Sequence, residues 1–128
     1  MNDEHNVESL VTANTFRWLF VVSLLVTTIA CLLPGDHINP NVGQFDKWLH
    51  GLAWCAIAFC STSALALHAR ARWLAIALFS WSFGVELAQH FVPMRAFEWA
   101  DLLANGGGVL VGISLARSLR RLPLITGK

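Results

Sequence analysis

The sequence predicts an all-α integral membrane protein, a bundle of four transmembrane helices in up-down topology. Charged residues are 13% of the 128 residues, which is about half of the ~25% usual in globular proteins. Mean hydropathy is +0.55. Four apolar segments follow one another, each near the length of roughly 20 residues that crosses a bilayer. Because the connections between them are short, successive helices should be antiparallel neighbours.

The helices are expected at about residues 16–33, 47–67, 73–91 and 101–119, within a single domain that covers residues 1–128. Pro34 and Gly35 follow the first helix and Pro93 follows the third, and both are signals that end a helix. The first apolar segment also has features of a cleaved signal, including a lipoprotein signal that would end at Cys31. Such leaders carry positive charge, whereas this one is acidic. We therefore expect the segment to remain as a helix.

Basic residues predict the orientation of the bundle. One side carries Arg17, Arg70, Arg72, Arg117, Arg120, Arg121 and Lys128, whereas the other side carries Lys47 and Arg95. The positive-inside rule places the side richer in arginine and lysine in the cytoplasm, so both termini are expected there. The chain should be a multi-pass protein of the inner (cytoplasmic) membrane.

Polar residues collect near the outer ends of the second, third and fourth predicted helices. They are Asp46, Lys47, His50, Glu86, Gln89, Arg95, Asp101 and Asn105. Most are spaced by three or four residues within a helix, so each helix presents one polar face. At 1.5 Å per residue, His50 should lie roughly 5 Å and Glu86 roughly 8 Å below the membrane surface. Three polar faces at one depth predict a single site in the outer leaflet, facing the periplasm or cell exterior.

Each of these residues also has a structural interpretation. Asp46 and Asp101 are suited to satisfying free N–H groups at a helix start. Lys47 could extend to lipid phosphates, and His50 could be an interior histidine bonded to Asp46. Glu86 is the strongest functional candidate, because an acid inside an apolar span is costly and usually functional. Its structural alternative is a neutral acid hydrogen-bonded to a neighbouring residue.

Two further residues of the outer layer are expected to play lesser parts. His90 should be peripheral, and Glu98 should be a solvated loop or capping residue.

Glycines and cysteines predict packing rather than chemistry. Gly108 and Gly112 match the spacing at which small residues let membrane helices approach closely, which would bring Asn105 within reach of the other helices. Cys31, Cys55 and Cys60 lie in apolar segments and are expected to behave as small buried residues. We assign no metal ion and no cofactor, because one histidine among carboxylates is a weak zinc pattern.

The spacing of these polar and glycine residues resembles the VanZ-like family. The resemblance rests on Asp46-Lys47 with His50, Glu86-x-x-Gln89, Pro93-x-Arg95, Asp101, Asn105-x-x-Gly108 and Gly112. It covers about two-thirds of the chain. The family consists of small membrane proteins named for a member linked to teicoplanin resistance, so the resemblance implies a membrane bundle and a role in glycopeptide susceptibility.

Three classes of function are consistent with these residues. In the first, Lys47, Gln89, Arg95 and Asn105 bind a phosphate-bearing or lipid-linked envelope substrate, or a peptide end. Asp46, His50, Glu86 and Asp101 would then supply acid/base groups, whether the protein is an enzyme or only a binder. The second class is a small proton-coupled transporter in which Glu86 titrates. The third is a structural or accessory module in which the polar residues join helices.

The net charge of +1 shows no electrostatic footprint for nucleic acid. Membrane lipids are the expected partners, and the sequence leaves the oligomeric state open.

Overall fold

The computed structural model describes residues 2–34, 42–65 and 70–121. This part of the chain is all-α, as predicted, and contains no strand. Its four helices are α1 (Asn2–Leu32), α2 (Val42–Leu65), α3 (Ala71–Gln89) and α4 (Trp99–Arg121).

Two helices begin well before their predicted first residues. α1 starts at Asn2 rather than near residue 16, because hydropathy marks only the apolar part of a helix and the polar residues before it continue the same helix. α2 starts at Val42 rather than near residue 47. Asp46 and Lys47 therefore lie beyond the first turn of α2. The interpretation of Asp46 as a helix-start residue is wrong, and Lys47 does not face the free N–H groups.

In the part of the chain that the structure describes, three helices are long and apolar enough to cross a membrane. The candidate spans are Leu10–Leu32, Phe45–Leu65 and Trp99–Arg121. α3 is not among them, since its 19 residues include both Arg72 and Glu86. Large apolar side chains such as Val22, Leu25 and Ile29 are exposed along α1. An exterior of this kind suits lipid rather than water as the surrounding solvent.

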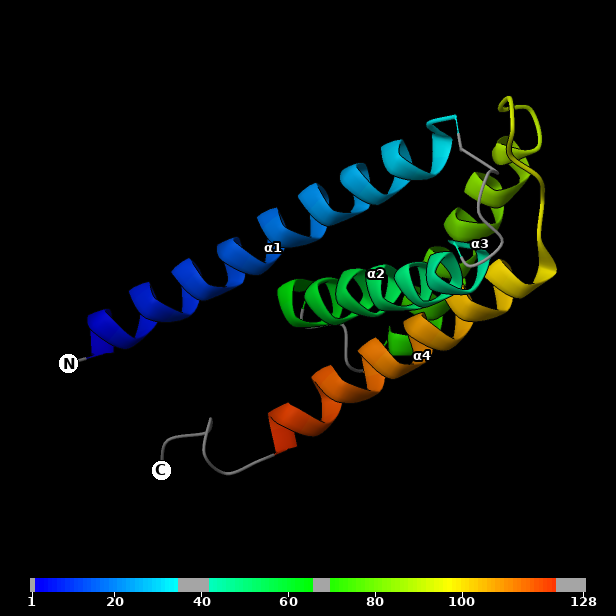
Figure 1. Cartoon of the computed structure of the whole chain (residues 1–128). Coiled ribbons are helices and arrows are strands. Elements are labelled where there is room, and N and C mark those ends of the chain that lie inside the picture. The colour runs from blue at the N-terminus through cyan, green and yellow to red at the C-terminus, as the bar shows by residue number, and fades with distance from the viewer. Residues whose placement is uncertain (1, 35–41, 66–69, 122–128) are drawn as a thin grey trace.

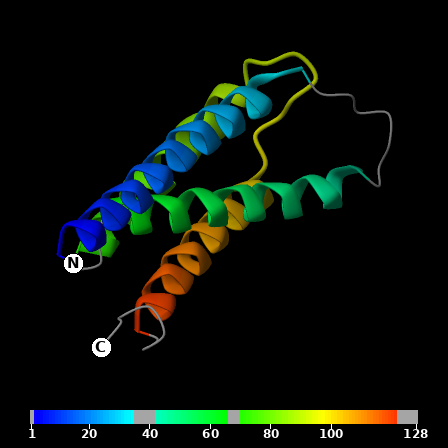
Figure 2. The same cartoon turned by 90° about the vertical axis from the view of Figure 1, so that its left-hand side faces the viewer.

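The helices alternate in direction along the bundle. Figure 1 shows α1 beginning on the same side of the molecule as α4 ends, while the segment between α3 and α4 lies on the opposite side. In the turned view of Figure 2 this segment, drawn in yellow, descends from the end of α3 to the start of α4. The starts of α2 and α4 therefore share one end of the bundle with the end of α3. We call this the polar end.

α2 and α4 form the most closely packed helix pair, and glycines make the contact possible. A Cβ atom at Gly108 would collide with the carbonyl oxygen of Gly51, and one at Gly112 would collide with the carbonyl oxygen of Cys55. The predicted packing role of Gly108 and Gly112 is thus confirmed. Trp54, Ile57, Val109 and Ile113 build the apolar core on the same helix pair.

Candidate functional site

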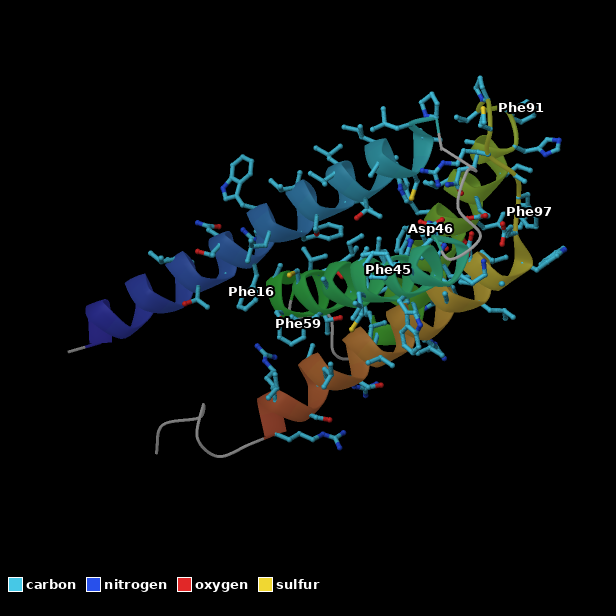
Figure 3. The ribbon with its side chains drawn as sticks, in the orientation of Figure 1. Phe16, Phe45, Asp46, Phe59, Phe91 and Phe97 are labelled. Atoms are coloured by element: carbon cyan, nitrogen blue, oxygen red, sulfur yellow. The ribbon has the colours of Figure 1, made fainter. Side chains whose placement is uncertain are left out.

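The predicted site residues lie at the polar end of the bundle. Figure 3 shows Asp46 on the same side of the molecule as Phe91 and Phe97, far from Phe16 and Phe59. The most deeply buried members are His50, Glu86, Gln89, Asp101 and Asn105, each at most 6% exposed. Burying so many polar side chains is costly unless each finds a partner. The contacts of each group therefore indicate what the site is built to hold.

His50 on α2 is oriented by Asn105 on α4. Its Nδ1 atom lies 3.2 Å from Oδ1 of Asn105. Because an amide oxygen can only accept, Nδ1 is the donor in this bond, and in the neutral ring this tautomer leaves a lone pair on Nε2. Nε2 lies 3.9 Å from Oδ1 of Asp46 and 4.0 Å from Sγ of Cys31. The unprotonated nitrogen is thus directed at a carboxylate without being hydrogen-bonded to it at ordinary length.

Lys47 joins two acids that flank the start of α4. Its Nζ donates to Oε2 of Glu98 at 2.7 Å and lies 3.4 Å from Oδ1 of Asp101. The Glu98 side chain is 51% exposed, whereas that of Asp101 is 8% exposed. Lys47 therefore supplies positive charge to a buried carboxylate while its own side chain stays 33% exposed.

Arg95 joins the α3–α4 segment to α1. Its Nε donates to the carbonyl oxygen of Leu33 at 3.1 Å, and an Nη atom donates to that of Ala30 at 3.5 Å. These carbonyls are at the end of α1, where the last helical C=O groups have no partner inside the helix. Arg95 also lies 3.8 Å from Oδ2 of Asp46. Met94, in the left-handed region with φ 62°, turns the chain just before it.

Glu86 and Gln89 on α3 are each bonded through one side-chain atom only. Oε1 of Glu86 accepts from the backbone N–H of Glu98 at 3.1 Å, and Nε2 of Gln89 donates to the carbonyl oxygen of Cys31 at 2.9 Å. Among the residues that the structure describes, three buried side-chain oxygens accept no hydrogen bond: Oε2 of Glu86, Oε1 of Gln89 and Oδ1 of Asp101, the last of which is ion-paired with Lys47 at 3.4 Å. The site therefore offers acceptors to a ligand that brings proton donors or positive charge.

Ligand atoms of Asp46, His50 and Asp101 all lie within 4.8 Å of one another. They are the described residues that could together hold a metal ion. This grouping links the His50–Asn105 pair to the Lys47–Asp101 pair, and Arg95 joins it through Asp46. Glu86 connects to the set through Glu98, and Gln89 connects through Cys31. The structure places these residues together at the polar end. Their roles as catalytic or binding groups remain predictions.

Two contributors to the site lay outside the predicted set. Glu98 is solvated, as predicted, with 51% of its side chain exposed, and its carbonyl accepts from the N–H of Asp101 at the start of α4; it also contacts Lys47 and Glu86. Cys31 is buried, as predicted; its thiol also lies near His50, and its backbone carbonyl accepts from Gln89. Cys31 lies three residues before Pro34, at a predicted helix end that is level with the other polar residues. This position was the signal in the sequence that Cys31 could contribute to the site. His90 is exposed, in agreement with its predicted peripheral position.

An apolar groove of about 470 Å³ runs between α3 and α4. Its walls include Ile76, Phe79, Leu103, Gly106, Gly107 and Leu110. Leu102, which also lines it, directly follows Asp101, and Gly106 directly follows Asn105. Because successive residues of a helix point about 100° apart, the groove lies on a different face of α4 from Asp101 and Asn105, which do not line it.

Comparison with known proteins gives one family. No curated protein and no solved structure matched the chain. The model of the family described as VanZ/LLP1 matches residues 5–120, a stretch that includes all four helices almost entirely and every residue of the candidate site. The chain therefore belongs to the VanZ/LLP1 family.

Proposed function

We propose that this protein binds the phosphate-bearing headgroup of a lipid-linked cell-envelope intermediate at its polar end and so acts as a headgroup receptor. The observation that carries the proposal is the convergence, at one end of the bundle, of two cations and three buried oxygens that accept no hydrogen bond. Lys47 and Arg95 supply charge-assisted donors to phosphate. The oxygens of Glu86, Gln89 and Asp101 would accept from hydroxyl or amide groups of the same headgroup.

The proposal includes four membrane crossings, with the polar end facing the periplasm or cell exterior. α3 supports its own crossing because its outward face is apolar, with Trp73, Ile76, Trp81 and Phe83 exposed. Arg70 and Arg72 at the start of α3, and Arg117, Arg120 and Arg121 near the end of α4, favour a cytoplasmic position for the opposite end. Labelling from outside with a membrane-impermeant thiol reagent should modify a Phe91→Cys variant and spare an Arg72→Cys variant. The reverse pattern would place the site on the cytoplasmic side.

The groove is where we place the hydrocarbon chain of the lipid. It is apolar, lies between α3 and α4, and is lined by Leu102 and Gly106, the residues that follow Asp101 and Asn105 in the chain. A headgroup at the polar end would direct its chain along this path. The polar end, where a bound headgroup would be held, carries four carboxylates and one imidazole: Asp46, Glu86, Glu98, Asp101 and His50. Each of these groups can transfer a proton. This arrangement supports acid/base chemistry as an extension of binding.

Two other functions receive less support from this geometry. A proton-coupled carrier usually binds near the bilayer midplane, whereas these residues gather at one end. Interhelical bonding explains Asn105 and Gln89, but it does not explain the buried oxygens of Glu86 and Gln89 that accept no hydrogen bond. By its family, the protein is also expected to lower susceptibility to glycopeptides such as teicoplanin.

Lipid binding to the full-length protein in detergent tests the proposal. Native mass spectrometry would compare a polyprenyl phosphate with the corresponding polyprenol. We expect at least tenfold stronger retention of the phosphate, because the alcohol offers no charge to Lys47 and Arg95. Gly107→Leu should weaken binding of both lipids by filling the groove, since a Cβ at Gly107 meets nothing within 4 Å.

The matched control is Gly84→Leu, at another helical glycine where a Cβ meets nothing within 4 Å and which does not line the groove. It should leave lipid binding unchanged. Equal retention of phosphate and alcohol would reject the headgroup site. Equal effects of the two leucine variants would reject the groove.

A further inference from the structure

We propose that Asp46, His50 and Asp101 form a binding site for a divalent transition-metal ion such as Zn²⁺. One ligand atom from each residue lies within 4.8 Å of the other two. An ion about 2.1 Å from each atom would hold tetrahedral or octahedral ligands roughly 3.0–4.2 Å apart. Small side-chain rotations would therefore close the site without moving the helices.

The orientation of His50 favours metal binding. Asn105 accepts the proton of Nδ1 at 3.2 Å, so the lone pair of Nε2 is directed toward Asp46 at 3.9 Å. That distance is too long for a hydrogen bond but suits two atoms that share an ion. Histidines that bind metals typically donate their other ring N–H to an oxygen in this way.

Asp101 gives a second, separate indication that an ion can bind here. The residue is 6% exposed, and its Oδ1 atom accepts no hydrogen bond. Lys47 lies 3.4 Å from this oxygen but donates to Glu98 at 2.7 Å. An ion at Asp101 can therefore be accommodated while Lys47 keeps its bond to Glu98.

The ligand set indicates the class of ion. An imidazole nitrogen suits zinc and its first-row neighbours, whereas calcium and magnesium take oxygen ligands. Three protein ligands leave a fourth position open, as in catalytic zinc sites. Asp46, with 36% of its side chain exposed, lies on the open side, where an ion and a further ligand can enter.

Acidic side chains exceed basic ones at the polar end, so a bound cation would reduce the excess negative charge. Asp46, Glu86, Glu98 and Asp101 outnumber Lys47 and Arg95 there, so a divalent ion would offset the excess of acids and add an attraction for phosphate. The ion site itself stands on the geometry of its three residues and does not require that the ligand of the pocket be a lipid.

Zinc titration of the chelator-treated, full-length protein in detergent tests the site. We expect one Zn²⁺ per chain by isothermal titration calorimetry and by elemental analysis. Asp46→Asn, His50→Gln and Asp101→Asn should each weaken binding at least tenfold. Asn105→Leu should also weaken it, by about 10–100-fold as for other residues that orient a ligand, and Asn105→Asp should restore it because a carboxylate accepts the same proton.

His90→Gln is the control, because His90 is an exposed histidine at the same end. It should bind zinc as the parent does. Asp46→Asn decides the result if other variants unfold, since the contacts of Asp46 with His50 and Arg95 are no shorter than 3.8 Å. Unchanged affinity in Asp46→Asn, or zinc binding lost only with His90, would overturn the site.

Polyprenyl phosphate binding measured with and without chelator separates this inference from the proposed function. Lipid binding in a protein that takes up no zinc would overturn the ion site alone. Zinc binding in a protein that retains no lipid would support the ion site and reject the headgroup proposal.

Discussion

Lys47 and Asp101 show how a single ion pair sustains the polar end. The ammonium group is partly exposed, whereas the carboxylate is buried among α2, α3 and α4. A buried acid that loses its cation is costly, because neither water nor another donor replaces the lost partner. The lysine is therefore expected to contribute to stability as well as to binding.

We expect Lys47→Gln to destabilise the protein by about 1–3 kcal/mol, the cost of leaving a buried acceptor unpaired. Adding Asp101→Asn should recover much of the loss, because the double variant has no buried charge left to compensate. Glu98→Gln is the matched control. Its side chain is 51% exposed, so the change should cost less than about 1 kcal/mol.

Denaturation in mixed detergent micelles measures all four proteins of this cycle. Strict additivity of Lys47→Gln and Asp101→Asn would show that the two residues do not interact. That result would contradict the role given to their ion pair.

At the scale of elements, the contact of α2 with α4 determines where the site can form. Gly108 and Gly112 allow the backbones to approach, and this approach places Asn105 on α4 against His50 on α2. The arrangement links a packing motif to the orientation of a candidate ligand. Widening the helix pair should therefore disturb both stability and the histidine.

Gly108→Ala should destabilise the protein by about 1–3 kcal/mol, since overpacking forces the backbones apart. The added Cβ would meet the carbonyl of Gly51. Gly107→Ala is the control, one residue earlier in the same helix and with open space around its Cβ. It should leave the melting temperature unchanged or raise it, because alanine favours a helix over glycine.

Melting temperatures of the two alanine variants provide the comparison. If Gly108→Ala melted at the same temperature as Gly107→Ala, the close contact between α2 and α4 would not limit stability.

At the scale of the whole molecule, the order of apolar segments was enough to predict four helices and the end at which their polar residues gather. The i,i+3 and i,i+4 spacings correctly predicted the buried pairs Glu86/Gln89 and Asp101/Asn105. The start of α2 was not predictable from hydropathy, because residues before Phe45 continue the helix without adding to its apolar segment.

The contribution of α1 was missed for a different reason. Arg95 and Gln89 bond to backbone carbonyls of Ala30, Cys31 and Leu33. Every residue carries a backbone carbonyl. The side-chain sequence therefore does not predict which carbonyls will accept hydrogen bonds from Arg95 and Gln89. Contacts of this kind become visible only once the helices are placed together.

The central claim is that the polar end is a ligand site and not only a set of bonds between helices, and Glu86→Gln tests it most directly. Oε1 of Glu86 accepts one backbone hydrogen bond, which an amide oxygen can also accept. The variant should therefore fold and melt within a few degrees of the parent. An amide cannot exchange the proton or carry the charge that a carboxylate offers to a ligand.

The measurement compares the melting temperature of Glu86→Gln with its ability to restore teicoplanin tolerance in a deletion strain that shows the phenotype. The account predicts a folded protein at normal abundance that fails to restore tolerance. Full complementation by Glu86→Gln at normal abundance would contradict the account and leave interhelical bonding as the role of these residues.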